Sequence, residues 1–151
     1  MLTVDRPADM KAHVGEDMGA SDWLLVDQAM IDKFAEATGD HQWIHVDVER
    51  AKKEMPGGKT IAHGYLTLSL LAGLAHQTHE ILHRSRGINY GSDRVRFTAP
   101  VPAGSRVRLH QKLLKVEDID GGVRMTFASQ MEVEGHSRPA LIAETISLAY
   151  D

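Results

Sequence analysis

Residues 60–79 read TIAHGYLTLSLLAGLAHQTH, and apolar side chains occupy nearly every face of a helix drawn through this stretch. A helix that is apolar all round is buried among the other elements of a fold. The longest apolar run, Ile61 to Ala75, is short for a membrane span and is interrupted by His63, Thr67 and two glycines. We therefore expect one buried helix over residues 60–79, at the centre of the domain.

The second half of the chain changes to a two-residue period, which is typical of half-buried strands. Between Val123 and Val133 every second residue is apolar apart from Ser129, and Asp120-Gly121-Gly122 just before them is typical of a tight hairpin turn. Further strands are predicted over residues 94–98, 106–116 and 141–150. A meander of long antiparallel strands and one buried helix together predict an α+β domain, in which a curved sheet wraps around the helix.

The first third of the chain is predicted to be mainly helical. Asp27 is a typical N-cap residue, and Gly39 is typical of the position just past a helix C-terminus. Apolar residues lie at helical spacing between them, which predicts a helix over residues 28–38. Residues 45–53 have a weaker helical pattern, and residues 55–59 (Met-Pro-Gly-Gly-Lys) are predicted to form a loop.

Length and composition limit the domain organisation and the chemistry. The chain has 151 residues, of which 42% are hydrophobic and 25% charged, as expected for one globular domain spanning residues 1–151. The absence of cysteine excludes disulfides, thiolate metal sites and cysteine nucleophiles. The N-terminus lacks the basic region and apolar core of a signal peptide. We therefore expect a soluble cytoplasmic protein that does not enter a membrane.

Charge is unevenly distributed along the chain. The net charge of −4 argues against nucleic acid as a partner. Residues 84–115, however, contain eight basic side chains and only one acidic residue, Asp93, while residues 1–40 and 116–151 contain more acids than bases. This basic stretch is either a solvated face of the fold or a patch for an anionic ligand.

Two short patterns could carry chemistry. His79-Glu80-Ile81-Leu82-His83 matches the zinc-protease motif H-E-x-x-H, in which two histidines on one helical face bind zinc. A third ligand is needed downstream, but no glutamate follows before Glu117, which lies near the end of a predicted strand. We therefore interpret the segment as polar residues on the exposed last turn of the helix, and we expect no metal site.

The second pattern is an aspartate, Asp40, followed five residues later by His45. On a straight helix these side chains would lie about 140° apart, so they converge only if the chain bends after Gly39, where the preceding helix is predicted to end. A carboxylate and an imidazole held together can position and activate a water molecule. The pair is therefore the candidate acid–base site.

Four segments together resemble the MaoC-like hydratase family, a group of hot-dog-fold proteins that includes the (R)-specific enoyl-CoA hydratases. They are residues 39–47 (GDHQWIHVD), 60–66 (TIAHGYL), 89–91 (NYG) and 97–104 (FTAPVPAG). Most family members have Asn-Pro in place of Gln42-Trp43, and the Gln-Trp version is similar to a branch that includes the nodulation protein NodN. The resemblance covers nearly the whole chain and implies a single hot-dog domain.

The resemblance assigns roles to individual residues. It implies that Asp40 and His45 bind and activate the water, and that the Gly64 amide faces the thioester oxygen of the substrate. His63 and Gly91 fall at family positions near the substrate, although His63 could serve only to shape the start of the helix. Ser69 falls where some members place a hydroxyl near the active-site histidine, and it is equally a small residue that eases helix packing. Trp43 either narrows the pocket or is a core aromatic.

The resemblance also implies the reaction. Water adds reversibly to a trans-2-enoyl thioester to give an (R)-3-hydroxyacyl product, without a metal or redox cofactor. Coenzyme A enters as part of the substrate, with acyl carrier protein as an alternative carrier, and we expect Arg94 and Arg106 of the basic stretch to contact its phosphates. Because family members pair at their open faces, we expect a homodimer at least. The alternatives are a hot-dog acyl-thioesterase and a non-catalytic acyl-thioester binding protein.

Overall fold

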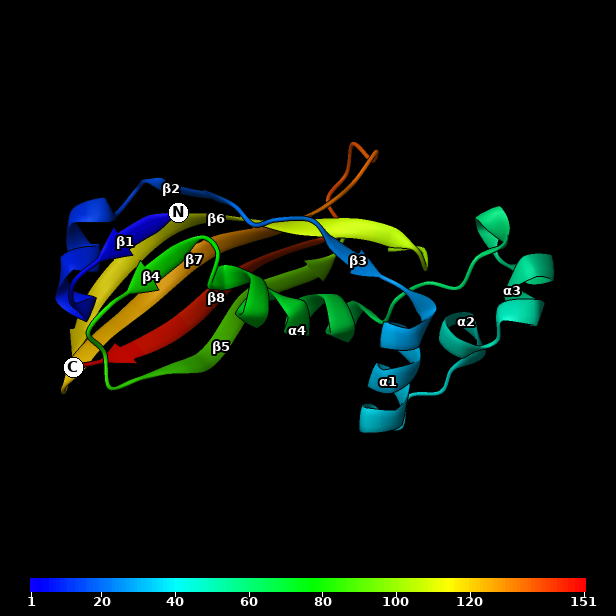
Figure 1. Cartoon of the computed structure of the whole chain (residues 1–151), viewed down its shortest axis with the longest axis horizontal. Coiled ribbons are helices and arrows are strands. Elements are labelled where there is room, and N and C mark those ends of the chain that lie inside the picture. Colours follow the sequence, from blue (N-terminus) through cyan, green and yellow to red (C-terminus); the bar gives the residue numbers. More distant parts are fainter.

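The computed structural model describes residues 1–151 and is built around a six-stranded antiparallel sheet (Figure 1). The sheet has the strand order β2-β6-β7-β8-β5, with β3 also paired to β6. Its strands are β2 (Asp17–Ala20), β3 (Leu24–Val26), β5 (Arg86–Phe97), β6 (Ser105–Ile119), β7 (Gly122–Val133) and β8 (Leu141–Tyr150). The expected meander is present in β6, β7 and β8, but β5 lies beside β8 at the edge of the sheet.

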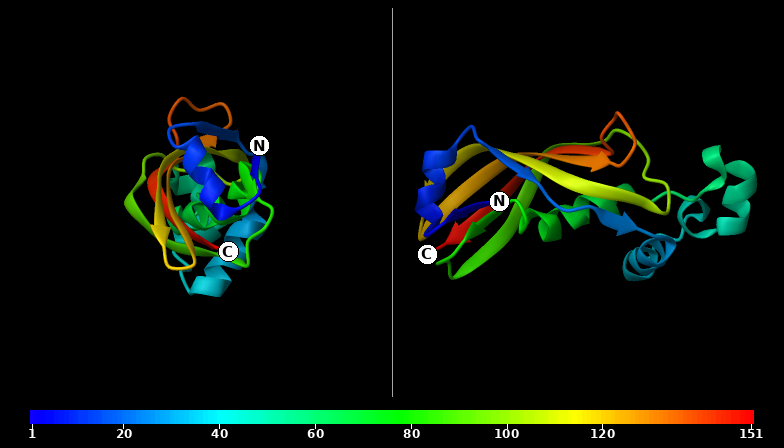
Figure 2. Two further views of the ribbon diagram at one scale, coloured as in Figure 1. Left: turned by 90° about the vertical axis from the view of Figure 1, so that its left-hand side faces the viewer. Right: turned by 45° about the horizontal axis from the view of Figure 1, so that its top comes forward.

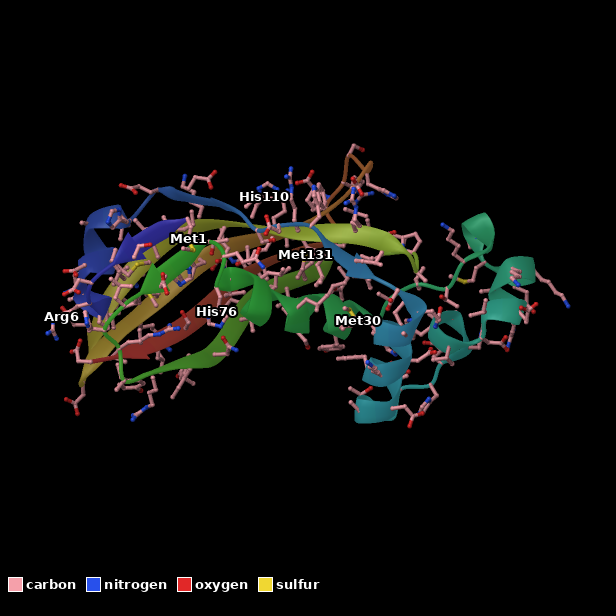
Figure 3. All side chains as sticks on the ribbon, viewed as in Figure 1. Met1, Arg6, Met30, His76, His110 and Met131 are labelled. Carbon is pink, nitrogen blue, oxygen red and sulfur yellow. The ribbon has the colours of Figure 1, made fainter.

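Helix α4 (Gly64–Ala75) lies along the inner face of this sheet and contacts β6, β7 and β8 (Figures 1 and 2). The two-residue period of the strands decides which side chains reach it. Met131 of β7 is fully buried in the core with Leu66 and Leu71 of the helix, whereas His110 of β6 points to the outer face (Figure 3). The predicted α+β architecture, with a curved sheet wrapped around one central helix, is confirmed.

The central helix is shorter than residues 60–79, so that prediction is wrong at both ends. Residues before Gly64 are extended, because the Ala62 amide donates to the carbonyl of Val101 and Ile61 forms a β-bridge with Pro102. After Ala75 the chain turns and enters strand β4 (His79–Ile81), which pairs in parallel with β1 (Leu2–Val4). Pairing with segments distant in sequence therefore overrides the local helical pattern.

The prediction of a mainly helical first third is also wrong over residues 1–26. This segment contains β1, β2, β3 and a short 3-10 helix, η1 (Pro7–His13). β2 and β3 are short strands that extend the sheet along β6. Their brevity leaves too few residues for a two-residue apolar period to be visible in the sequence.

Three helices gather at one end of the sheet, and the last two extend beyond it (Figure 1): α1 (Gln28–Thr38), α2 (Trp43–Val46) and α3 (Val48–Glu54). The ends of α1 are as predicted, because the Asp27 carboxylate accepts the Met30 amide at 2.9 Å and Gly39 adopts a left-handed conformation with φ of 79°. The loop predicted over residues 55–59 contains only the short 3-10 turn η2 (Pro56–Gly58).

One face of the chain is left open. Strand β5 is exposed along nearly its whole length, and Tyr65 on the neighbouring helix is 69% exposed. Ile88, Tyr90 and Phe97 add further exposed apolar surface along this strand. No helix of the chain is both long enough and apolar enough to cross a membrane.

Candidate active site

The bend after Gly39 brings Asp40 and His45 together. The Asp40 carboxylate accepts the amide of Gln42 at 3.2 Å, and helix α2 then begins and carries His45 inward. Potential ligand or proton-transfer atoms of Asp40, His45 and His63 all lie within 4.8 Å of one another. Asp40 is exposed while both histidines are buried, so the carboxylate lies at the mouth of the cluster.

The surroundings of His45 define its protonation. Its Nδ1 lies 2.6 Å from the carbonyl of Ile61, and because a carbonyl only accepts, Nδ1 carries the proton and Nε2 is free to accept one. Burial lowers the pKa of His45, and His63 lowers it further. The hydrogen bond to Ile61 and the charge of Asp40 act in the opposite direction. The ring is therefore neutral near pH 7, as a proton acceptor must be.

His63 connects the two members of the pair. It is only 3% exposed, and its Nε2 donates to the backbone carbonyl of Asp40 at 2.9 Å. Its ring stacks on His45 with centroids 3.9 Å apart, and Phe34 packs against it at 4.9 Å. The buried Nδ1 of His63 has no hydrogen-bond partner.

By residue type, the cluster of Asp40, His45 and His63 could also bind a metal ion. The orientation of its two histidine rings tests whether it does. The two rings lie nearly parallel, with an interplanar angle of 24°. Imidazole lone pairs lie in the plane of the ring, and a zinc ion needs each nitrogen at about 2.0–2.1 Å. Stacked rings do not direct two nitrogens at one ion, so the arrangement fits acid–base chemistry better than metal binding.

The start of α4 contributes a hydrogen-bond donor to the same place. The N–H groups of Gly64 and Tyr65 belong to the first turn, where no intrahelical acceptor exists and the helix dipole is positive. A side chain at Gly64 would put its Cβ 2.8 Å from the ring of Phe97, so any larger residue requires this ring to shift. Gly64, His45, Thr67 and Phe97 all line one cavity of about 270 Å³. An acid–base group and an oxyanion donor thus share one cavity.

Two further residues of the predicted site lie elsewhere in the chain. Ser69 and Gly91 line a different cavity, farther along α4. The Ser69 hydroxyl donates to the carbonyl of Tyr65 at 2.7 Å, one turn earlier in the helix. Within one chain the structure does not bring them to Asp40 and His45, and their roles remain predictions.

Four of the eight basic side chains of the basic stretch form ion pairs with glutamates. Arg106 forms a two-pronged pair with Glu134, which raises the pKa of Arg106 and lowers that of Glu134. Arg94 lies 3.5 Å from Glu144, with its side chain 83% exposed. Arg106 is therefore committed to a partner, and Arg94 is the more available of the two for an anion.

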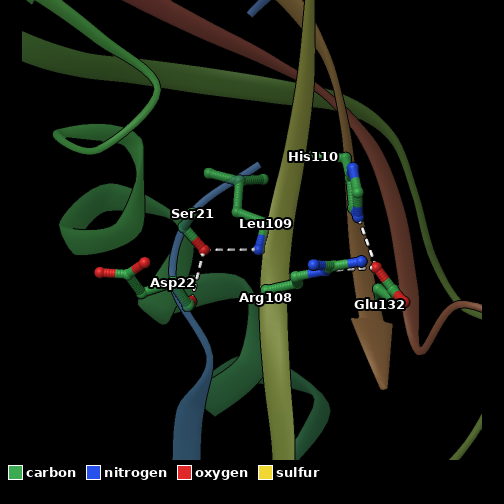
Figure 4. A network of polar contacts seen from close by, with 6 residues as sticks. All are labelled: Ser21, Asp22, Arg108, Leu109, His110 and Glu132. Atoms are coloured by element: carbon green, nitrogen blue, oxygen red, sulfur yellow. Dashed lines mark hydrogen bonds and ion pairs between the residues drawn. The ribbon is translucent and has the colours of Figure 1, made fainter. Parts of the chain in front are cut away.

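A second network on this face joins Arg108 and His110 to one carboxylate (Figure 4). Arg108 and His110 both contact the carboxylate of Glu132, at 2.6 and 2.5 Å, and both hydrogen bonds lower its pKa. Beside it, the Ser21 hydroxyl accepts the amide of Leu109 at 2.9 Å, which fixes the segment between β2 and β3 against β6. For this part of the basic stretch, the paired charges favour a solvated face over a patch for an anionic ligand.

The H-E-x-x-H segment does not form the last turn of a helix, so that interpretation is wrong. His79 lies on β4 and stacks on Phe127 with centroids 4.8 Å apart, and burial lowers its pKa to about 4. His83 lies beyond the strand and contacts the carboxylate of Asp5 at 2.7 Å. The two histidines have separate partners because β4 ends at Ile81, so that His83 lies outside the strand and beside Asp5.

Trp43 opens helix α2 and packs beneath Arg50, whose guanidinium lies 3.9 Å from the ring centroid. It does not line the cavity at His45. Sequence reasoning missed Gln28, whose side chain donates to the carbonyl of His45 at 2.7 Å and accepts the hydroxyl of Thr60. It also did not assign Phe97 to the site, although Phe97 begins the family segment 97–104, whereas Gln28 belongs to no pattern that spacing could reveal.

Comparisons with known proteins decide the family. Residues 9–134 match the family described as "MaoC like domain". The chain belongs to the MaoC-like family. This MaoC-like protein is 50% identical over 147 residues to 3-hydroxyacyl-thioester dehydratase Z of Mycobacterium tuberculosis, covering 97% of each chain. It is 46% identical over 143 residues to nodulation protein N of Rhizobium leguminosarum bv. viciae, covering 93% of this chain and 89% of that one.

Solved structures agree on the fold of the MaoC-like protein. It matches an (R)-hydratase from A. caviae with a TM-score of 0.71 at 22% identity, covering 89% of this chain and 94% of that one. It matches a monoamine oxidase regulatory protein from Archaeoglobus with a TM-score of 0.79 at 24% identity, covering 100% and 99%. The predicted hot-dog fold and family are therefore confirmed, and the protein is an enzyme of the hydro-lyase class.

Proposed function

We propose that this MaoC-like protein is an (R)-specific enoyl-CoA hydratase, which adds water reversibly to trans-2-enoyl thioesters to give (R)-3-hydroxyacyl thioesters. The observation that carries the proposal is the placement of His45 and the first-turn N–H groups of α4 at one cavity, with Asp40 beside them. The names of the dehydratase Z relative and of the (R)-hydratase neighbour support the thioester substrate and the stereochemistry.

The chemistry follows from the positions of three groups. Asp40 holds a water molecule while Nε2 of His45 takes one of its protons, and the water oxygen bonds to the β carbon. The electron pair of the double bond moves toward the thioester oxygen, where the Gly64 N–H stabilises the developing charge. The proton on His45 then passes to the α carbon. Water adds as a proton and a hydroxyl group with no net oxidation or reduction, so we propose no redox cofactor, and we propose no metal because these three groups account for the proton transfers and the developing charge.

Coenzyme A enters as part of the substrate, and acyl carrier protein is an alternative carrier. Of the two arginines expected at its phosphates, Arg94 is exposed and weakly paired, while Arg106 is held by Glu134. We propose a homodimer, because the outer edge of β5 is unpaired and is flanked by exposed Tyr65, Tyr90 and Phe97. Light scattering should then give a mass of at least two protomers. We also propose that the protein works in the cytoplasm.

The deciding experiment is product analysis with crotonyl-CoA. The proposal expects 3-hydroxybutyryl-CoA, resolved as the (R) enantiomer on a chiral column, without release of free coenzyme A. Release of the free thiol would instead identify a thioesterase. Binding without turnover over a range of enoyl-CoA chain lengths would identify a non-catalytic binding protein.

A further inference from the structure

Helix α2, which carries His45, is too short to hold its own position. It has four residues, and the side chain of its N-cap residue, Gln42, makes no capping hydrogen bond. Isolated helices of this length are not stable in water, because the first turn fixes several dihedral angles for a single hydrogen bond. The position of the His45 ring therefore depends on contacts that reach α2 from other elements.

Two of these contacts come from the segment that precedes α4. The Ile61 amide donates to the carbonyl of Ile44 at 3.0 Å, and the Ile61 carbonyl accepts Nδ1 of His45 at 2.6 Å. This segment is itself fixed to the turn before β6, since the Ala103 amide donates to the carbonyl of Thr60 at 2.9 Å. A segment fixed in this way can support α2.

Gln28, at the start of α1, connects the backbone of His45 to the same segment. Its amide nitrogen donates to the carbonyl of His45 at 2.7 Å, and its amide oxygen accepts the hydroxyl of Thr60, which is only 2% exposed. Because a carbonyl only accepts hydrogen bonds, the nitrogen end of the amide must face His45. The amide nitrogen also donates to Asp32 at 2.8 Å, so both of its N–H groups have partners and the Gln28 amide has one orientation.

His45 is therefore held at two points by adjacent residues. Thr60 holds its backbone through Gln28, and Ile61 holds its ring. The contact at the ring keeps the proton on Nδ1 and leaves Nε2 to accept a proton from water. A shift of the His45 backbone would disturb this contact, and a misplacement of about 1 Å can cost a factor of about 10² in rate.

We propose that Gln28 and Thr60 are positioning residues for the reaction, which hold the backbone of His45 so that its ring keeps the tautomer and the place of a proton acceptor. The inference rests on the proposed hydratase function. Neither residue lines the cavity at His45, so neither is expected to contact the substrate. Their loss should therefore lower kcat and leave KM nearly unchanged.

Steady-state hydration of crotonyl-CoA tests this role with two pairs of variants. Gln28→Leu removes the hydrogen bonds to His45 and Thr60 and should lower kcat about tenfold or more. Gln77→Leu is its matched control, because Gln77 bonds the backbone amide of Asp22 at 2.7 Å beyond the C-terminal end of α4, and its kcat should equal the wild-type value.

The second pair leaves Gln28 in place and removes only its partner. Thr60→Val is nearly isosteric but lacks the hydroxyl, whereas Thr60→Ser keeps it. The kcat of Thr60→Val should be about three- to tenfold below that of Thr60→Ser, which is the factor expected for one ordinary hydrogen bond. This pair decides the question if Gln28→Leu does not fold.

Nitrogen-15 NMR of the imidazole rings measures the position of the proton without turnover. The chain has nine histidines, and the His45 signals are those that disappear in His45→Gln. In the wild type Nδ1 of His45 should carry the proton, and in Gln28→Leu and Thr60→Val the tautomer with the proton on Nε2 should appear as well. Loss of packing elsewhere in the chain would not change this signal.

The two measurements separate this inference from the proposed function. Crotonyl-CoA left unhydrated by the wild type contradicts the hydratase assignment, whereas the NMR spectrum still tests how His45 is held. An unchanged His45 spectrum in both Gln28→Leu and Thr60→Val would overturn the inference. Equal kcat values in Thr60→Val and Thr60→Ser, or an effect confined to KM, would also overturn it.

Discussion

The ring of His63 stacks on the ring of His45 at 3.9 Å, while its Nε2 holds the backbone carbonyl of Asp40 at 2.9 Å. One buried side chain thus contacts both members of the acid–base pair, which belong to a loop and to a four-residue helix. Catalytic geometry depends on such support, because a small misplacement of a reacting group costs a large factor in rate.

The first prediction concerns the pair itself. Asp40→Asn keeps the shape and the hydrogen bond to Gln42 but removes the charge, and His45→Gln removes the titrating ring. Each should lower kcat for crotonyl-CoA hydration by about 10²–10⁴-fold. The double variant should be little worse than the worse single one, because residues that act as a unit are not additive.

The thermal midpoint provides the control for these variants, since Asp40 is exposed and its substitution should leave stability nearly unchanged. Glu49→Gln, at an exposed acid of the nearby helix α3, should leave kcat at its wild-type value. Wild-type hydration rates in either Asp40→Asn or His45→Gln would contradict the assignment of this site.

The second prediction concerns His63. His63→Phe keeps a stacking ring but cannot bond the Asp40 carbonyl, and His63→Gln can keep the bond but loses the stack. Both should lower kcat about tenfold or more while KM changes little. Because His63 contributes to the lowered pKa of His45, its removal should raise that pKa. His45 must be neutral to accept a proton, so the acidic limb of the kcat/KM profile should move to higher pH.

A His63 variant that lost stability but kept the wild-type pH profile would show that the residue only supports the fold. Urea unfolding of both variants supplies the stability data needed for that comparison. The pH profile is the decisive measurement, because a packing defect alone does not move it.

The third prediction concerns Gly64. Alanine usually favours a helix over glycine by about 0.5–1 kcal/mol, but here its methyl group would lie 2.8 Å from Phe97. Gly64→Ala should therefore destabilise the protein and lower kcat, since the ring and the first turn of α4 must separate. Phe97→Ala combined with Gly64→Ala should restore the thermal midpoint relative to Gly64→Ala alone. If Gly64→Ala by itself raised the midpoint, the contact would not constrain this position.

How much of this arrangement could be predicted differs between its parts. The Asp27 cap, the Gly39 stop and the turn at Gly121 are local, so the sequence predicts them correctly. The ends of α4 are not local, because β1 and the bridge from Ile61 to Pro102 determine them. The proximity of Asp40 to His45 could be predicted only on the condition that the chain bends after Gly39.

The supporting contacts could not be predicted, because they join segments far apart in the sequence. Gln28 reaches the His45 carbonyl from α1, and Phe97 covers Gly64 from the end of β5. The partners of the basic stretch, Glu132, Glu134 and Glu144, follow from strand register, which composition does not reveal. The sequence therefore left open whether the basic stretch is a solvated face or a patch for an anionic ligand.

The fourth prediction concerns coenzyme A. Arg94→Glu should raise KM for crotonyl-CoA more than KM for crotonyl-pantetheine, because only the former carries the nucleotide phosphates. Arg106→Gln should have a smaller effect, since Glu134 already neutralises that arginine. Steady-state kinetics with both thioesters in moderate salt measures the difference. Equal effects on the two substrates would show that Arg94 does not contact the phosphates.

The last prediction concerns stability and pH. Burial, reinforced by Arg84 and His76, lowers the pKa of His79 from 6.5 to about 4 in the folded protein. Between these values the unfolded chain binds the proton and the folded chain does not, so stability is complete above pH 6.5 and falls as the pH decreases toward 4. A shift of this size corresponds to about 3 kcal/mol at most. His79→Gln cannot titrate, so its free energy of unfolding in urea should fall less than that of the wild type between pH 7 and pH 4.5.

His83→Gln, at the exposed histidine of the same motif, is the control, and its free energy of unfolding should fall as much as that of the wild type. An identical decline in the wild type and in His79→Gln would show that carboxylates alone cause the acid sensitivity.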